Sequence, residues 1–332
     1  MAEPFFSLNP RDQAGLIGKH AASMKMLPRI IEKDIWVCWA LDKLFQMPNR
    51  STMAFKGGTS LSKVYKAIDR FSEDIDVTID YRNFATQTVG TESRMQLMRL
   101  SESLKEKLKK HSTESIKPYF ESVLEAEFSG QDWKVDLEND GEKLSVHYPS
   151  ALKTGGYIES KVLLEFGVRN VTEPAEQHVV KTYISEYTED ITFPEASVDV
   201  LALLRTFWEK ATLAHVEYHR PQQRQTADRL SRHWYDLFKM SNDIENLCSE
   251  ASRDLLGEVV KHKKQFFHYG FANYDDCING NLRIVPRDHF KTVLASDFSA
   301  MIKAGMFYQD PPEFEEILEK LHHIEDAINK AQ

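Results

Sequence analysis

The sequence contains few cysteines, and they are not arranged for a metal site or a disulfide framework. Among 332 residues there are three, at Cys38, Cys248 and Cys277, and no two of them form a Cys-x-x-Cys pair. An odd number of widely separated cysteines argues against both a cysteine-ligated zinc site and a small disulfide-bonded domain. We therefore expect reduced thiols in a cytoplasmic protein.

Long apolar segments are also missing. No apolar run approaches the roughly 20 residues that span a bilayer, and the start, MAEPFFSLNPRDQ, lacks the basic-then-apolar order of a secretory signal. Internal repeats and low-complexity linkers are absent as well. At 42% hydrophobic and 11% aromatic residues, the chain can form one large or two ordinary globular domains. These features predict a soluble cytoplasmic protein without a membrane partner.

Acidic residues outnumber basic ones, with 51 Asp and Glu against 42 Lys and Arg, which gives a formal net charge of −9. This value disfavours a protein that coats nucleic acid non-specifically. One segment, from Arg205 to His233, departs from the average with six basic residues against three acidic ones. Its basic residues are Arg205, Lys210, Arg220, Arg224, Arg229 and Arg232. This excess predicts a local basic surface for an RNA partner.

The most informative pattern lies between Phe55 and Asp80, in FKGGTSLSKVYKAIDRFSEDIDVTID. Alternate residues of a strand share one face, so Asp74 and Asp76 would lie side by side and repel each other unless a divalent cation is bound between them. Upstream, the sequence GGTS offers glycines that let a phosphate approach the backbone, together with amide hydrogens and hydroxyls. The segment therefore predicts a site for a metal ion and a nucleoside triphosphate.

This order and spacing resembles the active-site signature of the DNA polymerase β-like nucleotidyltransferase superfamily. More closely, GGTSLSK followed by RFSEDIDV resembles the AbiEii/AbiGii-type toxin nucleotidyltransferases of bacterial abortive-infection and toxin–antitoxin loci, which serve in phage defence. The resemblance implies that Mg²⁺ or Mn²⁺ binds to Asp74 and Asp76. It also implies that the phosphates of a nucleoside triphosphate (NTP) are held by Gly57, Gly58, Thr59 and Ser60.

A third carboxylate is expected on a neighbouring strand, because enzymes of the superfamily commonly place one there to bind metal or to accept the proton of the acceptor hydroxyl. Glu165, on the polar face of the alternating segment KVLLEFGVRN, is the best-placed candidate. Asp136 and Glu138, in WKVDLEND, compete for this assignment.

Two further strings resemble family motifs in the second half of the chain. Lys210, in TFWEK, matches a lysine that contacts nucleotide phosphates, a task that suits a flexible ammonium group. In SRHWYDLF, the residues Arg232 or His233 and Asp236 lie three or four positions apart, which places them on one helix face. The resemblance implies that Asp236 and a basic neighbour face the nucleotide, and it leaves open whether Glu165 or Asp236 acts as the base.

The predicted fold is α+β. Residues 1–195 are expected to form a nucleotidyltransferase-like mixed β-sheet with flanking helices and the metal site, and residues 196–332 a helical domain that completes the nucleotide and acceptor cleft. Apolar spacing predicts helices over 32–45, 95–110, 198–217, 226–240, 288–304 and 314–328. Asn139-Asp140-Gly141 predicts the turn of a β-hairpin.

The function predicted from the resemblance is transfer of a nucleotidyl group from an NTP, with release of pyrophosphate. The protein would be a toxin whose acceptor is RNA, such as the 3′ end of tRNA, and a cognate antitoxin protein would restrain it. Two alternatives remain open on the sequence. One is transfer to a small hydroxylated molecule such as an aminoglycoside antibiotic, and the other is a GTP-binding protein without turnover.

Overall fold

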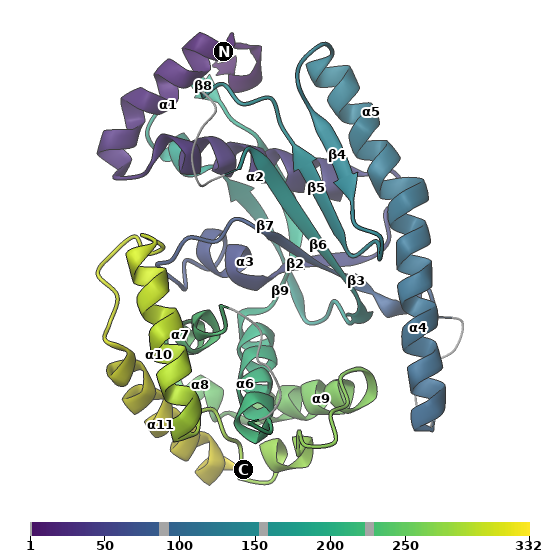
Figure 1. Ribbon diagram of the computed structural model, residues 1–332, viewed down its shortest axis with the longest axis vertical. Coiled ribbons are helices and arrows are strands. Elements are labelled where there is room, and N and C mark those ends of the chain that lie inside the picture. The colour runs from purple at the N-terminus through teal and green to yellow at the C-terminus, as the bar shows by residue number, and fades with distance from the viewer. Residues whose placement is uncertain (1, 86–92, 153–158, 223–228) are drawn as a thin grey trace. The chain divides into compact units, whose positions relative to one another are not determined.

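The computed structural model describes residues 2–85, 93–152, 159–222 and 229–332 (Figure 1). The chain forms two compact units. The first comprises Met1–Val64, Glu73–Gly90 and Arg99–Val200, and the second comprises Tyr65–Ser72, Thr91–Met98 and Leu201–Gln332. The short segment Tyr65–Ser72 thus belongs to the second unit, although the chain on both sides of it belongs to the first. The division predicted after residue 195 lies at the start of the strand β9 (Glu195–Leu201).

The first unit is built on a mixed sheet that has seven strands in the described part of the chain, in the order β4-β5-β6-β3-β2-β9-β7. Strand β3 is parallel to β6, and β2 to β9, whereas β4–β5, β5–β6 and β2–β3 are antiparallel. Besides β9, the strands are β2 (Met53–Lys56), β3 (Ile75–Asp80), β4 (Lys134–Leu137), β5 (Lys143–His147), β6 (Lys161–Asn170) and β7 (Ala175–Lys181). A smaller sheet pairs β1 (Glu3–Pro4) with β8 (Ile191–Thr192).

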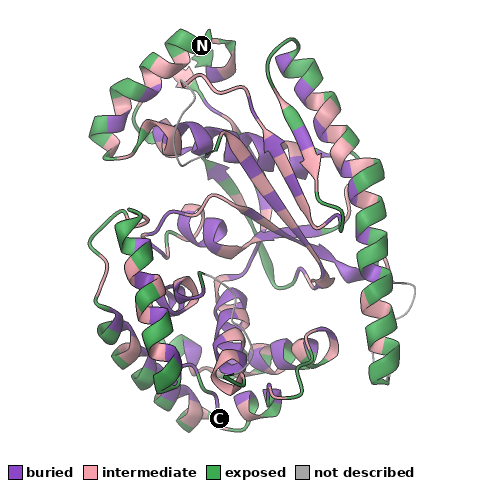
Figure 2. Ribbon diagram, in the orientation of Figure 1, coloured by how far each residue is buried: buried purple, intermediate pink, exposed green. Residues whose placement is uncertain are grey.

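The two faces of this sheet differ in burial. Residues along β6 alternate strictly, with Val162, Leu164, Phe166 and Val168 buried and their neighbours half-buried. Helix α2 (Pro28–Gln46) packs against β6, and α1 (Pro10–Met24) packs against α2. Figure 2 shows buried residues gathering on the strands and on α2. One face of the sheet therefore lies in the core, and the other carries the polar residues.

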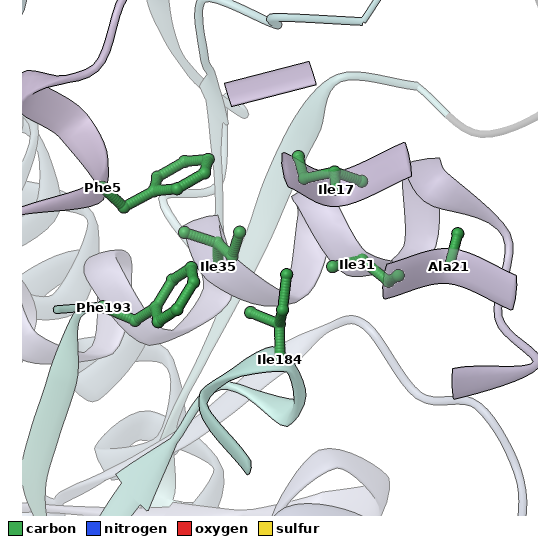
Figure 3. Packing of buried hydrophobic residues seen from close by; sticks show 7 residues of the cluster. All are labelled: Phe5, Ile17, Ala21, Ile31, Ile35, Ile184 and Phe193. Carbon is green, nitrogen blue, oxygen red and sulfur yellow. The ribbon is translucent and has the colours of Figure 1, made fainter. Parts of the chain in front are cut away.

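Apolar side chains close the end of the unit where α1 and α2 meet. The 3-10 helices η1 (Phe5–Ser7) and η4 (Tyr183–Glu186) contribute to this cluster (Figure 3). Its buried members are Phe5, Ile17, Ala21, Ile31, Ile35, Ile184 and Phe193. The short helices α3 (Gly57–Lys63) and η2 (Tyr81–Asn83) flank β3 in the chain. Helix α4 (Arg94–His111) continues through the π-helix η3 (Ser112–Ile116) into α5 (Lys117–Phe128), which packs against β4.

The second unit is helical. Its helices are α6 (Leu203–His219), α7 (Ser231–Met240), α8 (Ile244–Leu247), α9 (Glu250–Phe266), the 3-10 helix η5 (Tyr274–Ile278), α10 (Asp288–Lys303) and α11 (Phe314–Ala331). Helix α7 packs against α6, α10 and α11, and α9 packs against α6. The side chains of Trp208 and Trp234 are fully buried among them. The predicted α+β class, with a mixed sheet followed by a helical half, is confirmed.

Most of the predicted elements are present. The helices predicted over 32–45, 95–110, 288–304 and 314–328 correspond to α2, α4, α10 and α11, and the predicted hairpin joins β4 to β5. The helix predicted from Val198 is wrong at its start, because Ala196, Val198 and Val200 alternate with more exposed residues and form β9. Residues 226–228 of the helix predicted over 226–240 lie outside the described residues, and α7 begins at Ser231.

Candidate active site

The sequence GGTS joins a strand directly to a helix: β2 ends at Lys56, and α3 begins at Gly57. Gly57 has a φ of +80°, and a β-carbon at this position would lie 1.9 Å from Oδ2 of Asp76. Both observations require glycine, since other residues rarely adopt positive φ and any side chain would collide with the carboxylate. The carboxylate of Asp76 therefore lies against the backbone at the start of α3.

The hydroxyls of Thr59 and Ser60 are buried and bonded to the backbone. Thr59 Oγ1 donates a hydrogen bond to the carbonyl oxygen of Asp74 at 2.6 Å, and Ser60 Oγ donates to that of Gly57 at 2.9 Å. The Thr59 bond ties the first turn of α3 to the residue that precedes β3, and the Ser60 bond lies within that turn. The contact of both hydroxyls with phosphates stays a prediction, and the structure gives each of them a structural role.

The strand register brings Asp76 and Glu165 together. Asp76 of β3 lies opposite Glu165 of β6 and opposite Lys56 of β2, while Glu165 lies opposite Lys143 of β5. Residues paired across strands share a face, so these four side chains form one row across the sheet. Asp74, one residue before β3, falls on the same face by alternation. All five residues are half-buried.

This donor set suits a hard divalent cation. Carboxylate oxygens are the ligands that Mg²⁺ prefers, and the carboxylate of Asp76 lies where a side chain on residue 57 would otherwise be. Glu165 Oε1 also pairs with Lys143 Nζ at 3.0 Å, and this hydrogen bond raises the pKa of Lys143. The residues present therefore fit a magnesium or manganese ion held by Asp74 and Asp76, with Glu165 beside them.

The two competing carboxylates lie farther along the sheet. Strand β4 is separated from β3 by β5 and β6. Asp136, on β4, pairs with Lys134 at 2.7 Å and with His147 at 3.2 Å. Glu138 follows the end of β4, and its N–H donates to the carbonyl oxygen of Lys143. Of the three candidates, Glu165 is the one in register with Asp76.

Two consecutive residues of α2, Lys33 and Asp34, anchor the site. Asp34 binds the Nζ of Lys63, the last residue of α3, and accepts the N–H of Tyr183 at 2.7 Å. Lys33 Nζ pairs with Glu73 Oε2, immediately before Asp74, at 2.6 Å. Helix α2 therefore holds both the helix that starts at Gly57 and the chain that enters β3. No spacing in the sequence reveals these long-range pairs.

A second group of predicted residues meets inside the helical unit. Lys210 Nζ, on α6, lies 2.9 Å from Oδ2 of Asp236 and 3.2 Å from Nδ1 of His233, both on α7. The same carboxylate receives two hydrogen bonds from Arg70, at 2.7 and 2.8 Å. Asp236 is fully buried. The sequence predicts that the motif residues gather, but it gives no signal for Arg70, whose partner lies 166 positions away. Arg232 is half-buried.

The charges of this group are strongly coupled. Burial alone would raise the pKa of Asp236, but Arg70 and Lys210 outweigh burial and hold that pKa well below its usual range. Burial lowers the pKa of Lys210, and the contact with Asp236 offsets part of this lowering. Burial and Lys210 together hold the pKa of His233 well below its usual value, so its ring is neutral near pH 7. An ionised carboxylate with three charged hydrogen bonds is a poor proton acceptor.

The prediction of a basic surface over the whole Arg205–His233 segment is wrong. Arg205 and Lys210 are buried, and each lies beside an acidic side chain. Arg220 makes two hydrogen bonds to Glu217, and Arg224 lies outside the described residues. Counting charges along the chain overestimates this surface because it cannot tell paired cations from free ones.

A group of possible metal ligands elsewhere in the second unit does not fit a metal ion. His215, His219 and Asp276 place one ligand atom each within 4.8 Å of one another. However, His215 Nδ1 accepts the N–H of Arg283 at 3.0 Å, and its Nε2 donates to the carbonyl oxygen of Asn273 at 3.2 Å. Both ring nitrogens of His215 are thus used by the backbone, and neither offers a lone pair to a metal.

In the described ranges, no helix combines the length and apolar composition that crossing a membrane requires. A mixed α+β fold with the carboxylate of Asp76 against a glycine turn agrees with a nucleotidyltransferase. The family model described as "Nucleotidyl transferase AbiEii toxin, Type IV TA system" matches residues 39–320. The chain belongs to this family, and it is accordingly a nucleotidyltransferase toxin of a type IV toxin–antitoxin system.

Among solved structures, the chain is similar to MenT4, a nucleotidyltransferase toxin from Mycobacterium tuberculosis H37Rv, at 18% identity and a TM-score of 0.47. The similarity covers 96% of this chain and 87% of that one. The comparison with curated proteins gave no match.

Proposed function

We propose that the protein transfers a nucleotidyl group from an NTP to an RNA acceptor, with a divalent cation bound at Asp74 and Asp76. The observation that carries the proposal is the register of the sheet, which sets Asp76 beside Glu165 and against the backbone of Gly57. Carboxylates on adjacent strands next to a glycine turn provide what a metal-bound triphosphate needs.

Each residue has a chemical role in this reaction. Asp74 and Asp76 would hold the cation, which, when bound, polarises the α-phosphate and neutralises charge on the departing pyrophosphate. The backbone of Gly57 and Gly58 would allow the phosphates to approach closely. The acceptor hydroxyl oxygen forms a new bond to the α-phosphorus as the bond to pyrophosphate breaks.

Glu165 is the group that we assign to the hydroxyl proton. It is half-buried and lies in register with Asp76. Its ion-pair partner Lys143, on β5, is half-buried as well. Asp236, by contrast, is fully buried and bonded to two cations, which fits an electrostatic role better than proton transfer. Lys210 would offset charge on the phosphates.

An RNA acceptor is supported by the charge of α4. This helix exposes six cations, of which Lys105 pairs with Glu142 and Lys110 with Glu114. Within the helix, only Glu102 and Glu106 oppose them. The cations are Arg94, Arg99, Lys105, Lys107, Lys109 and Lys110. In a chain of net charge −9, such a helix is suited to a phosphate backbone rather than to a small cationic antibiotic. A tRNA 3′ end provides the required hydroxyl, and it places the reaction in the cytoplasm.

The test is to incubate the protein with total cellular RNA, Mg²⁺ and each α-labelled NTP in turn. We expect label in a tRNA-sized band from one or more NTPs, and no label with Asp76→Asn. Label that appears only in a small molecule would favour an antibiotic-type acceptor. Binding of NTP without any labelled product would favour a GTP-binding protein without turnover. Either result would overturn the proposed RNA acceptor.

A further inference from the structure

The buried group around Asp236 has a net charge of +1. Arg70 and Lys210 each contribute a positive charge and Asp236 a negative one, while His233 accepts a hydrogen bond from Lys210 as a neutral ring. Arg70, Lys210 and Asp236 are exposed by 3%, 8% and 0%. Burying a charge without a counter-ion costs free energy, and a bound anion would remove that cost. The group is thus electrostatically prepared for an anion.

The geometry shows which cation is left over. Arg70 uses Nε and Nη2 to reach both oxygens of Asp236, the bidentate arrangement that neutralises a carboxylate most effectively. Lys210 contacts one of these oxygens and Nδ1 of His233. An ammonium group has three N–H donors, so one remains after these two contacts. Because Arg70 already balances Asp236, the charge of Lys210 is available to a ligand.

Arg70 is held in place independently of this ion pair. Its neighbour Asp69 pairs with Lys239 at 2.6 Å and accepts the N–H of Tyr308 at 2.9 Å. The N–H of Phe71 donates to the carbonyl oxygen of Met306 at 2.7 Å. The segment Tyr65–Ser72 therefore has anchors in the helical unit on both sides of Arg70. Replacing the guanidinium of Arg70 should therefore change the net charge around Asp236 without releasing the segment.

We propose that Arg70 is a positioning residue for nucleotide binding. By neutralising Asp236, it leaves the ammonium group of Lys210 free to bind a phosphate of the NTP. The inference rests on the proposed function, in which an NTP is the substrate. It assigns to Arg70 an electrostatic task that can be separated from the stability of the fold, because the same net charge can be restored in another way.

The test uses charge compensation in the full-length protein. We expect Arg70→Met to weaken the binding of NTP and of inorganic tripolyphosphate by about tenfold or more, measured by calorimetry, because Asp236 then cancels the charge of Lys210. Lys210→Met should cause a similar loss. The double variant Arg70→Met/Asp236→Asn restores one net positive charge, and we expect it to recover binding to within about threefold of the parent. Arg70→Lys, which keeps the charge, should also retain most of the affinity.

Lys239→Met is a matched control. It removes a cation that pairs with Asp69, next to Arg70, but that is not part of the buried group around Asp236. It should leave binding unchanged. The inference is overturned if Arg70→Met binds as the parent does. It is also overturned if the double variant and Arg70→Lys, both folded by circular dichroism, bind as weakly as Arg70→Met. A parent protein that binds no NTP would instead overturn the proposed function itself.

Discussion

Gly57 and Asp76 lie so close together that a β-carbon on Gly57 would be 1.9 Å from the carboxylate oxygen Oδ2 of Asp76. Glycine at position 57 therefore makes room for the carboxylate as well as for the backbone turn. It creates a place where an acidic side chain packs onto the first residue of α3 and remains half-buried. The pairing of β2 with β3, which sets Lys56 opposite Asp76, brings the start of α3 and this carboxylate together.

Gly57→Ala should impair both stability and activity. Alanine at a φ of +80° costs about 1–3 kcal/mol, and its β-carbon would push the Asp76 carboxylate away from its place. We expect a lower midpoint of thermal unfolding and a loss of turnover that exceeds the loss of folded protein. Gly18→Ala is the control, since nothing lies within 4 Å of a β-carbon there. Equal behaviour of the two variants would contradict the contact.

Asp76→Asn should abolish transfer and spare the fold. The substitution removes the charge that holds the cation but keeps the shape of the side chain, so we expect Mg²⁺-dependent pyrophosphate release to fall by about 100-fold or more. Asp74→Asn should behave similarly, and both variants should lose toxicity to growing cells. Asp136→Asn, on β4, is the matched control and should stay within about twofold of the parent, because Asp136 is not in register with Asp76. An active Asp76→Asn would disprove the metal site.

The sequence predicts those features that depend on neighbouring residues. The face shared by Asp74 and Asp76, the hairpin turn before β5 and the apolar stripes of α10 and α11 all follow from local periodicity and are present. What escapes prediction depends on residues far apart in the chain. Nothing near Arg70 indicates a partner at Asp236, 166 positions later. For the same reason, a count of basic residues cannot show that Arg205 is buried.

His215 should make the stability of the protein fall in mildly acidic solution. Burial lowers the pKa of His215 from its usual 6.5 to about 4, and its side chain is fully buried. The unfolded chain therefore binds a proton that the folded chain does not between these values. The stabilisation is fully present above pH 6.5 and is lost as the pH falls toward 4. Its size is roughly 3 kcal/mol at most.

Urea unfolding at a series of pH values measures this effect. In His215→Gln the free energy of unfolding should depend less on pH between 6.5 and 4 than in the parent. His322→Gln, at an exposed position of α11, is the control and should keep the pH dependence of the parent. If His215→Gln and the parent show the same slope, His215 does not become protonated on unfolding in this range.

The acceptor prediction can be tested on α4 without disturbing either group of site residues. Arg94 and Arg99 are exposed, and neither forms an ion pair with an acid in the described part of the chain. If RNA phosphates bind there, Arg94→Glu/Arg99→Glu should weaken tRNA binding. It should also reduce the slope of log affinity against log salt by roughly 0.7 per lost contact, or about 1.4 in all. Affinity for NTP should stay unchanged.

The control is Lys261→Glu, which reverses an exposed charge on α9. It should alter tRNA binding and its salt slope much less than the α4 variant does. An equal effect of both variants would mean that the net charge of the protein, and not a contact at α4, controls RNA binding. An unchanged salt slope in the α4 variant, with label still entering tRNA, would show that the acceptor binds at another surface.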